Sequence, residues 1–214
     1  MTEQGKLFIA VAGNIGSGKT TLTNKLSKTF DCIPHYESVE DNPYLEDFYQ
    51  DMGKYSFPLQ IYFLNHRFQA HRHIEKNGLR AVQDRSIYED AHIFAKNLFH
   101  QGLMTERDFE NYFTLFQHMT SVISPPDVMV FLRRSVPKLM ERIALRGRDF
   151  ESKISVDYIS QLNDLYANWY ATYNRGKFLL VDTDDIDLLN SENDYNELVS
   201  QVNSVISSSH EIYL

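Results

Sequence analysis

The sequence "KLFIAVAGNIGSGKTT", residues 6–21, constrains the fold of this chain more than any other stretch. It begins with a short, continuous apolar run that ends at a glycine, which is typical of a strand buried on both faces of a parallel sheet. The loop that follows fits the pattern G-x-x-x-x-G-K-[ST] at Gly13, Gly18, Lys19 and Thr20. A strand, a phosphate-binding loop and a helix are therefore expected at the start of the chain.

The loop pattern predicts a site for a nucleoside triphosphate. Glycines let successive backbone N–H groups curl around phosphates, and the next helix directs its positive N-terminus at the same anion. Lys19 would reach the β- and γ-phosphates, and the Thr20 hydroxyl would ligate Mg²⁺. The expected contacts are Gly13, Asn14, Ile15, Gly16, Ser17, Gly18, Lys19, Thr20 and Thr21. This loop alone does not distinguish GTPases, ATPase motors and small kinases.

Four more runs resemble strands, and helical patterns separate them. The strand-like runs are 32–37, 79–84, 127–133 and 177–182. The helical patterns are 19–30, 55–77, 88–101, 105–123, 136–146, 155–173 and 192–207. Alternating strands and helices imply a parallel sheet that helices cover on both faces. We therefore expect an α/β fold with about five parallel strands, in a single domain that spans residues 1–214.

Composition narrows the class of partner. Hydrophobic residues make up 43% of the chain and charged residues 23%, which is ordinary for a globular protein. The net charge of −8 does not attract a polyanion, so neither a nucleic acid polymer nor a membrane is expected as a partner. The single cysteine excludes an internal disulfide, and no signal peptide or membrane-spanning run is visible, so we expect a cytoplasmic protein. No metal-binding histidine motif is present, and we expect His66, His71 and His73 on a helix surface.

Acidic and arginine side chains follow the predicted strands, where ligands bind in an open α/β sheet. Glu37 follows the second strand, and Asp84 and Arg85 follow the third. A later segment clusters three arginines, namely Arg142, Arg146 and Arg148. These arginines would neutralise charge on a transferring phosphoryl group, although a solvated basic helix end is the alternative. No N-K-x-D motif of a regulatory GTPase is present in the sequence.

Taken together and in order, these motifs resemble those of the deoxynucleoside kinases, the family of deoxycytidine, deoxyguanosine and deoxyadenosine kinases. The matching stretches are "GNIGSGKTT", "YESVEDNPYL", "FYQDMGKYSFPLQIYFLNHR", "QDRSIYEDAHIFAKNLF" and "RIALRGRDFE". The similarity extends from about Phe8 to Trp169, and "DNPYL" and "DRSIYED" most resemble bacterial deoxyadenosine kinases. The resemblance implies a P-loop nucleoside kinase fold, phosphorylation of a deoxynucleoside 5′-hydroxyl by ATP, and a role in nucleotide salvage. It also implies Mg²⁺ as cofactor and a homodimer through helices around 55–77 and 88–101.

The resemblance also assigns residues to the reaction. Glu37 matches the general base beside the 5′-hydroxyl. Asp84 matches the acidic residue tied, with Thr20, to Mg²⁺, and it is the alternative proton acceptor. Arg85 would hold Glu37 and the 5′ oxygen in place. A lid at about 142–151 would supply Arg142, Arg146 and Arg148 to ATP, and the segment with Asp184 and Asp185 would hold its adenine.

The nucleoside would bind through a second set of residues. Tyr49 and Glu151 match the pair that hydrogen-bonds the sugar 3′-hydroxyl. Gln60 matches the glutamine that pairs with the base edge, and Phe94 matches the aromatic residue that stacks on the base. Taken singly, each residue has a plain alternative as a core aromatic, a helix cap or a surface side chain.

Base choice would depend on Arg67 and Asp90, which match residues that read cytosine or purines in this family. We expect the two charged groups to pair and to present an acceptor to an exocyclic amine. Phe63 departs from the animal enzymes, where the residue is smaller, so base preference does not transfer simply. Our order is deoxyadenosine, then deoxycytidine, then deoxyguanosine.

Three alternatives remain open at this point. A nucleoside monophosphate kinase of similar fold would share the loop and the lid, but its acceptor would need another basic pocket. A deoxyguanosine-specific kinase would share the whole framework. A non-catalytic nucleotide-binding module would keep the loop without needing Glu37, Arg85 and Glu151 together.

Overall fold

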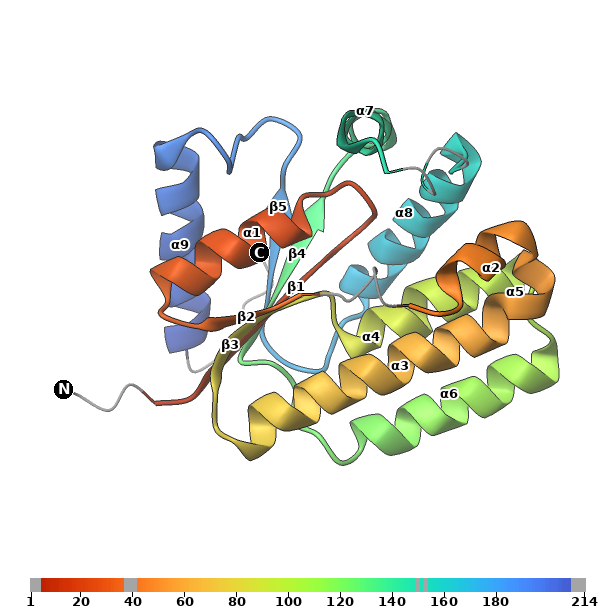
Figure 1. Cartoon of the computed structure of the whole chain (residues 1–214). Helices are drawn as coiled ribbons and strands as arrows, with labels where there is room; N and C mark the ends of the chain where they lie inside the picture. The colour runs from red at the N-terminus through yellow and green to blue at the C-terminus, as the bar shows by residue number, and fades with distance from the viewer. Residues whose placement is uncertain (1–4, 37–41, 149–150, 152–153, 209–214) are drawn as a thin grey trace.

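The computed structural model describes residues 5–36, 42–148, 151 and 154–208, and its centre is a parallel β-sheet (Figure 1). The strands are β1 (Leu7–Gly13), β2 (Ile33–His35), β3 (Arg80–Asp84), β4 (Val128–Arg133) and β5 (Phe178–Asp182). The described strands form one five-stranded sheet in the order β2-β3-β1-β4-β5, and every pairing is parallel. The predicted α/β fold with a parallel sheet is confirmed.

Helices connect these strands. They are α1 (Lys19–Thr29), α2 (Leu45–Gln50), α3 (Met52–Lys76), α4 (Ile87–Glu89), the π-helix η1 (Asp90–Ala95), α5 (Lys96–His100), α6 (Glu106–Thr120), α7 (Val136–Arg146), α8 (Val156–Ala171) and α9 (Glu192–Ser207). The helix expected over 88–101 is three consecutive pieces, with a π-helix in the middle. The short α2 was not predicted, because six residues are too few to display a helical period.

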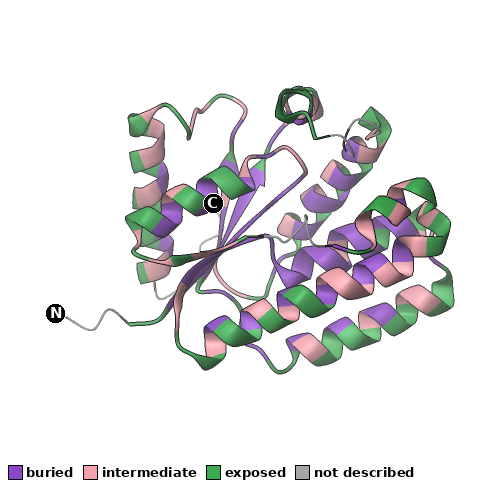
Figure 2. Cartoon of the chain, in the orientation of Figure 1, coloured by how far each residue is buried: buried purple, intermediate pink, exposed green. Residues whose placement is uncertain are grey.

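Two apolar cores lie on opposite faces of the sheet. Alternate residues of β1 point to opposite sides, so Ile9 and Val11 pack with α1 and α9, whereas Ala10 and Ala12 pack with α3, η1, α6 and α8. The purple, buried segments in Figure 2 lie along the strands and on the sheet-facing sides of the helices. No helix in the described part of the chain is long and apolar enough to cross a bilayer.

The surface position expected for His71 is wrong. His66 and His73 are exposed, but His71 is only 2% exposed, and its Nε2 atom lies 2.8 Å from the Ser124 carbonyl oxygen. Burial lowers the pKa of His71. The cause is helical spacing, because His71 lies on the same inward stripe of α3 as Leu64 and Ile74.

Candidate active site

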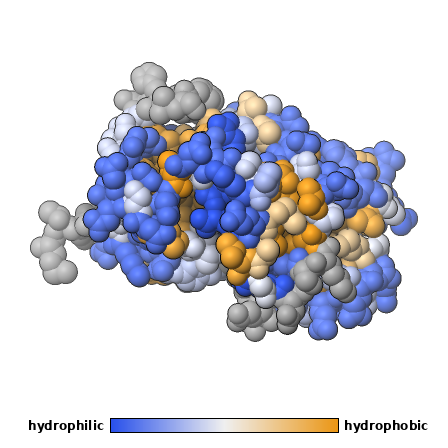
Figure 3. Space-filling view, turned by 90° about the horizontal axis from the view of Figure 1, so that it is seen from above, coloured by the Kyte–Doolittle hydropathy of each residue, from blue (hydrophilic) through white to orange (hydrophobic). Residues whose placement is uncertain are grey.

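The carboxyl ends of the strands carry the predicted ligand residues at one edge of the sheet. The pairing of β1 with β3 ends at Val11 and Asp84, and its pairing with β4 ends at Gly13 and Leu132. The phosphate-binding loop therefore starts between two neighbouring strand ends. Figure 3 views the molecule from this side and shows apolar side chains between hydrophilic ones near the middle of the face.

The loop requires glycine at its first position. Gly13 has φ +148°, and a Cβ atom added there would lie 2.7 Å from the Leu132 carbonyl oxygen and 2.8 Å from Ser17 Oγ. The loop ends at Gly18, which precedes α1 with φ +97°. Both conformations are ones that side chains with a Cβ adopt rarely. These conformations let the loop curl at the start of α1, where the positive helix N-terminus would attract an anion.

Lys19 folds back over the loop. Its Nζ atom donates hydrogen bonds to the carbonyl oxygens of Gly13, at 2.8 Å, and Asn14, at 2.9 Å, and the side chain is buried. The ammonium charge therefore lies over the concave side of the loop, where phosphate oxygens would bind.

Thr20 and Asp84 lie together, as expected for a shared metal site. The Thr20 hydroxyl donates to Asp84 Oδ2 at 2.5 Å. The second carboxylate oxygen, Asp84 Oδ1, is buried and has no hydrogen-bond partner among the described residues. A hydroxyl and a carboxylate are oxygen ligands of the kind that Mg²⁺ takes together with substrate phosphates, so the two residues fit this ion.

A cleft of about 770 Å³ opens beside the loop. It is lined by Gly16, Gly18, Lys19, Thr20, Thr21, Arg134, Lys138, Glu141, Arg142, Leu145, Arg146, Arg148, Asp184, Ile186 and Asp187. The three predicted lid arginines and Asp184 are among them. Asp185 is not, because its side chain is 99% exposed and contacts Lys138 instead. Arg134 and Lys138 add two positive charges that the sequence analysis missed, although both lie just after a predicted strand.

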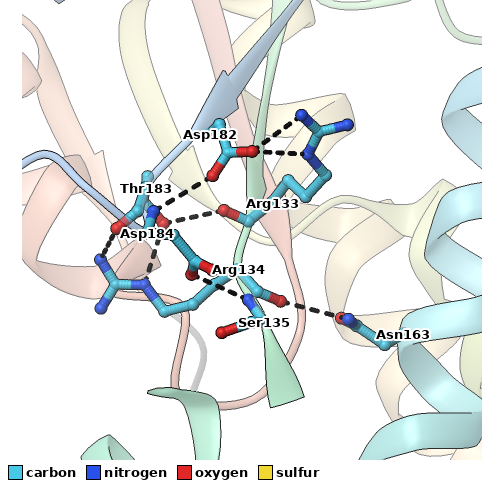
Figure 4. A network of polar contacts seen from close by, with 7 residues as sticks. All are labelled: Arg133, Arg134, Ser135, Asn163, Asp182, Thr183 and Asp184. Carbon is cyan, nitrogen blue, oxygen red and sulfur yellow. Dashed lines mark hydrogen bonds and ion pairs between the residues drawn. The ribbon is translucent and has the colours of Figure 1, made fainter. Parts of the chain in front are cut away.

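Arg134 ties the end of β4 to the segment after β5 (Figure 4). Its Nε donates to Thr183 Oγ1 at 2.9 Å, and Nη2 donates to the Thr183 carbonyl oxygen. Asp184 in turn accepts from the backbone N–H of Ser135 at 2.9 Å, and this bond lowers the pKa of Asp184. Asn163 of α8 donates to the Arg134 carbonyl oxygen at 3.1 Å. Asp184 therefore anchors the start of α7 as well as lining the cleft.

A second cavity, of about 150 Å³, lies on the other side of the loop. Its lining includes five residues predicted to bind or orient the nucleoside, namely Tyr49, Gln60, Arg85, Phe94 and Glu151, together with Asp84, which was predicted to hold Mg²⁺. It shares Lys19, Thr20, Arg146 and Arg148 with the larger cleft. The two spaces therefore meet at the loop lysine and the lid arginines.

Arg85 and Phe94 form one wall of the smaller cavity. The Arg85 guanidinium carbon lies 4.3 Å from the centre of the Phe94 ring. Arg85 has φ +70°, which is uncommon for a residue other than glycine, and its backbone N–H donates to the Val11 carbonyl oxygen at 2.9 Å. The strained backbone turns the Arg85 side chain toward the cavity.

Gln60 presents an acceptor to the same space. The residue is only 4% exposed, and its Oε1 atom has no hydrogen-bond partner among the described residues. A buried polar atom of this kind calls for a donor, since leaving it unsatisfied costs free energy. The plain alternative of a solvated Gln60 is therefore wrong.

Arg67 and Asp90 form a buried ion pair, as the sequence analysis expected. Their side chains are 6% and 1% exposed. Neither residue is among the described residues that line the smaller cavity, so they lie behind its wall. The Arg67 guanidinium carbon lies 4.8 Å from the centre of the Phe63 ring, which does line it.

Glu151 is held by the lid. Arg146 binds its carboxylate through Nε, at 3.0 Å, and through Nη2, and Arg148 Nη1 lies at 3.7 Å. Tyr158, which was not predicted, also lines the smaller cavity, and burial raises the pKa of Tyr158. Glu37, expected to be the general base, lies outside the described residues, and its neighbour Tyr36 lines the cavity.

A phosphate-binding loop, a separate cavity for a second small molecule and a basic helix beside both define a P-loop phosphotransferase. The family profile described as "Deoxynucleoside kinase" matches residues 9–207. The chain belongs to this family, and it is a kinase of P-loop nucleoside kinase fold. The family and fold implied by the motifs are confirmed.

Several relatives are similar over most of the chain. Deoxyadenosine/deoxycytidine kinase of Bacillus subtilis is 42% identical over 201 residues, which cover 93% of each chain. Deoxyadenosine kinase of Dictyostelium discoideum is 44% identical over 167 residues, 78% of this chain and 68% of the relative. The structure of deoxyadenosine kinase from M. mycoides with bound dATP superimposes with a TM-score of 0.81 at 29% identity, covering 92% of this chain and 100% of that one.

Proposed function

We propose that this deoxynucleoside kinase phosphorylates deoxyadenosine best, then deoxycytidine, then deoxyguanosine, with ATP as donor. The meeting of the two cavities at Lys19, Thr20, Arg146 and Arg148 carries the proposal. ATP would occupy the larger cleft with its phosphates on the loop, and the nucleoside would occupy the smaller cavity. The phosphoryl group would then cross at the shared residues, where four side chains can stabilise it.

Gln60 supports the order of bases. Its buried Oε1 accepts and can receive a hydrogen bond from the exocyclic amine of adenine or cytosine. Guanine carries a carbonyl oxygen in place of that amine, so the Gln60 amide would have to turn over to pair with it. The names of the Bacillus and Dictyostelium relatives, which both include deoxyadenosine, agree with this order.

Residues of this chain divide the work of the transfer. Thr20 and Asp84 would hold Mg²⁺, which when bound would neutralise charge on the phosphates and orient them. Arg146 and Arg148 would stabilise charge that develops on the moving group. Glu37 would accept the proton of the 5′-hydroxyl. Arg85 would hold that hydroxyl oxygen in line with the γ-phosphate.

One assay tests this proposal. ATP consumption is measured with each of the four deoxynucleosides and, separately, with their 5′-monophosphates. We expect the highest kcat/KM with deoxyadenosine and negligible turnover of the monophosphates. Preference for a monophosphate would instead indicate a nucleoside monophosphate kinase, and preference for deoxyguanosine would refute the proposed order of bases.

We also propose a homodimer, through α3, as the resemblance implied, and through α6 in place of the segment 88–101. The segment 88–100 is mostly buried inside the subunit, and among its residues only Lys96 and His100 are exposed, so it offers only a narrow polar face. Helices α3 and α6 lie side by side on the outside of the molecule (Figure 1), and Leu115 and Val122, on α6 and just beyond it, are 37% and 57% exposed. Light scattering on the wild type and on Leu115→Glu tests the interface, and a monomeric wild type would refute it.

A further inference from the structure

Glu89 is a buried carboxylate that no step of the proposed transfer uses. It ends the short helix α4 and has no exposed surface. Among the described residues that line the two cavities, Glu89 is absent, so it is not placed to contact either substrate. A fully buried carboxylate is rare unless its oxygens are satisfied.

Four donors satisfy this carboxylate. Oε1 accepts from the backbone N–H of Gly13 at 3.2 Å and from the Tyr166 hydroxyl at 2.7 Å. Oε2 accepts from the backbone N–H of Ser86 at 2.7 Å and from the Ser86 hydroxyl at 3.2 Å. Burial, together with the neighbouring carboxylate, raises the pKa of Tyr166, so its hydroxyl keeps the proton that it donates.

Glu89 lies just beyond the last backbone hydrogen bonds that join β1, which leads into the phosphate loop, to β3, which leads into the Asp84-Arg85 segment. The ladder between β1 and β3 ends at Val11 and Asp84, with one more bond from Arg85 N–H to the Val11 carbonyl oxygen. Beyond that point the two segments of backbone separate, and the one after β1 forms the phosphate loop whereas the one after β3 leads into α4. The Glu89 carboxylate then bridges Gly13 and Ser86, in the place of the next pair of ladder hydrogen bonds.

We propose that Glu89 is a positioning residue that sets the distance between the phosphate loop and the Asp84-Arg85 segment. The inference rests on the proposed function, in which the loop holds the donor and Asp84 and Arg85 serve the metal ion and the acceptor. A shift of either element would move the γ-phosphate relative to the 5′-hydroxyl. Displacements of about 1 Å can cost a reaction about 10²-fold in rate.

Glu89→Gln tests this role with little change of shape. An amide nitrogen cannot accept a hydrogen bond, so in either orientation one backbone N–H, of Gly13 or of Ser86, loses its acceptor. We expect kcat to fall by about 10²-fold, with a change of less than about threefold in the KM for deoxynucleoside, because Glu89 touches no substrate. Measurements are made well below the melting temperature of each variant.

Asp127→Asn is the matched control. The Asp127 carboxylate accepts from the backbone N–H of Phe8 at 2.7 Å, at the opposite end of the same strand. This change should lower stability and leave kcat within twofold of wild type. Equal losses of kcat in both variants would mean that Glu89 only stabilises the fold, and this would overturn the proposal. A folded Glu89→Gln variant with wild-type kcat would overturn it as well.

Tyr166→Phe keeps the test decisive if Glu89→Gln does not fold. It removes one of the four donors and leaves the carboxylate in place, so we expect a smaller fall in kcat of several-fold, and no fall would overturn the proposal. A wild type that phosphorylates none of the deoxynucleosides refutes the proposed function instead. Glu89 is then judged by whether Glu89→Gln weakens ATP binding more than Asp127→Asn does.

Discussion

The buried pair of Arg67 and Asp90 gives the sharpest prediction for stability and base choice together. Asp90→Ala leaves the Arg67 guanidinium buried without its carboxylate. Because the two side chains are 6% and 1% exposed, solvent cannot compensate the remaining charge. Loss of one partner of a buried ion pair typically costs about 3–5 kcal/mol, and we expect Asp90→Ala to lower the free energy of unfolding by that amount.

The double variant Arg67→Met with Asp90→Ala should recover most of this loss. It removes both charges, and an apolar replacement of a buried pair is often neutral or stabilising. Urea denaturation of the wild type, both single variants and the double variant closes a thermodynamic cycle, in which the coupling free energy is read directly. Single variants that lose less than about 1 kcal/mol, or a double variant that loses the sum of both, would refute the buried-charge reasoning.

The same four proteins report on the base. Arg67 packs on the Phe63 ring, and Asp90 begins the π-helix that carries Phe94, so the pair supports two walls of the smaller cavity. We expect Asp90→Ala to lower kcat/KM strongly for deoxyadenosine and deoxycytidine, and the double variant to recover activity and accept thymidine. If Asp90→Ala leaves kcat/KM unchanged for deoxyadenosine, deoxycytidine and deoxyguanosine, the pair does not influence base choice.

Four further changes have defined outcomes. Glu37→Gln should lower kcat by about 10²–10⁴-fold with little effect on nucleoside binding, and near-normal kcat would shift the role of base to Asp84. A dideoxynucleoside lacks the 3′-hydroxyl that Tyr49 and Glu151 would bind, so its transition state should lose about 1–3 kcal/mol of stabilisation, seen as a lower kcat/KM. Adenosine should also be a poor substrate. Arg134→Met should raise the KM for ATP by loosening Thr183, whereas the KM for nucleoside stays constant in the same steady-state series. Burial lowers the pKa of His92 to about 4. The neutral imidazole therefore contributes its full share to the free energy of unfolding above about pH 6.5, and this share falls as the pH drops toward 4. In denaturation curves measured across this range, His92→Phe should reduce that fall.

Local periodicity predicted most of the fold because each strand and long helix displays its own pattern. The runs at 7–13 and 128–132 are apolar on both faces, and the sheet buries both. What failed were features that depend on neighbours. His71 is polar, yet its place on the inward stripe of α3 puts it against the sheet. The break at η1 leaves no mark in a sequence whose apolar residues fit an ordinary helix.

Cavity-lining residues were predictable where a motif fixes the backbone, as at Lys19, Thr20 and Asp84. They were missed where an ordinary residue acquires its role from packing. Arg134 lines the larger cleft because β4 ends beside the segment after β5, and 49 residues separate it from Thr183. Glu89 gives no signal beyond a helix-start pattern with Ser86, since two of its four donors come from Gly13 and Tyr166.

The π-helix η1 makes this segment tolerant of changes in length. A π-turn holds one residue more than an α-turn, so deleting a single residue between Asp90 and Phe94 would restore an ordinary helix rather than break one. Because the π-turn takes up the extra residue, that deletion would leave Phe94 and α5 nearly in place relative to Asp90 and would shift the side chains between them. A one-codon deletion would therefore change the side chains packed behind Phe94 while α5 keeps its place, which no single substitution does.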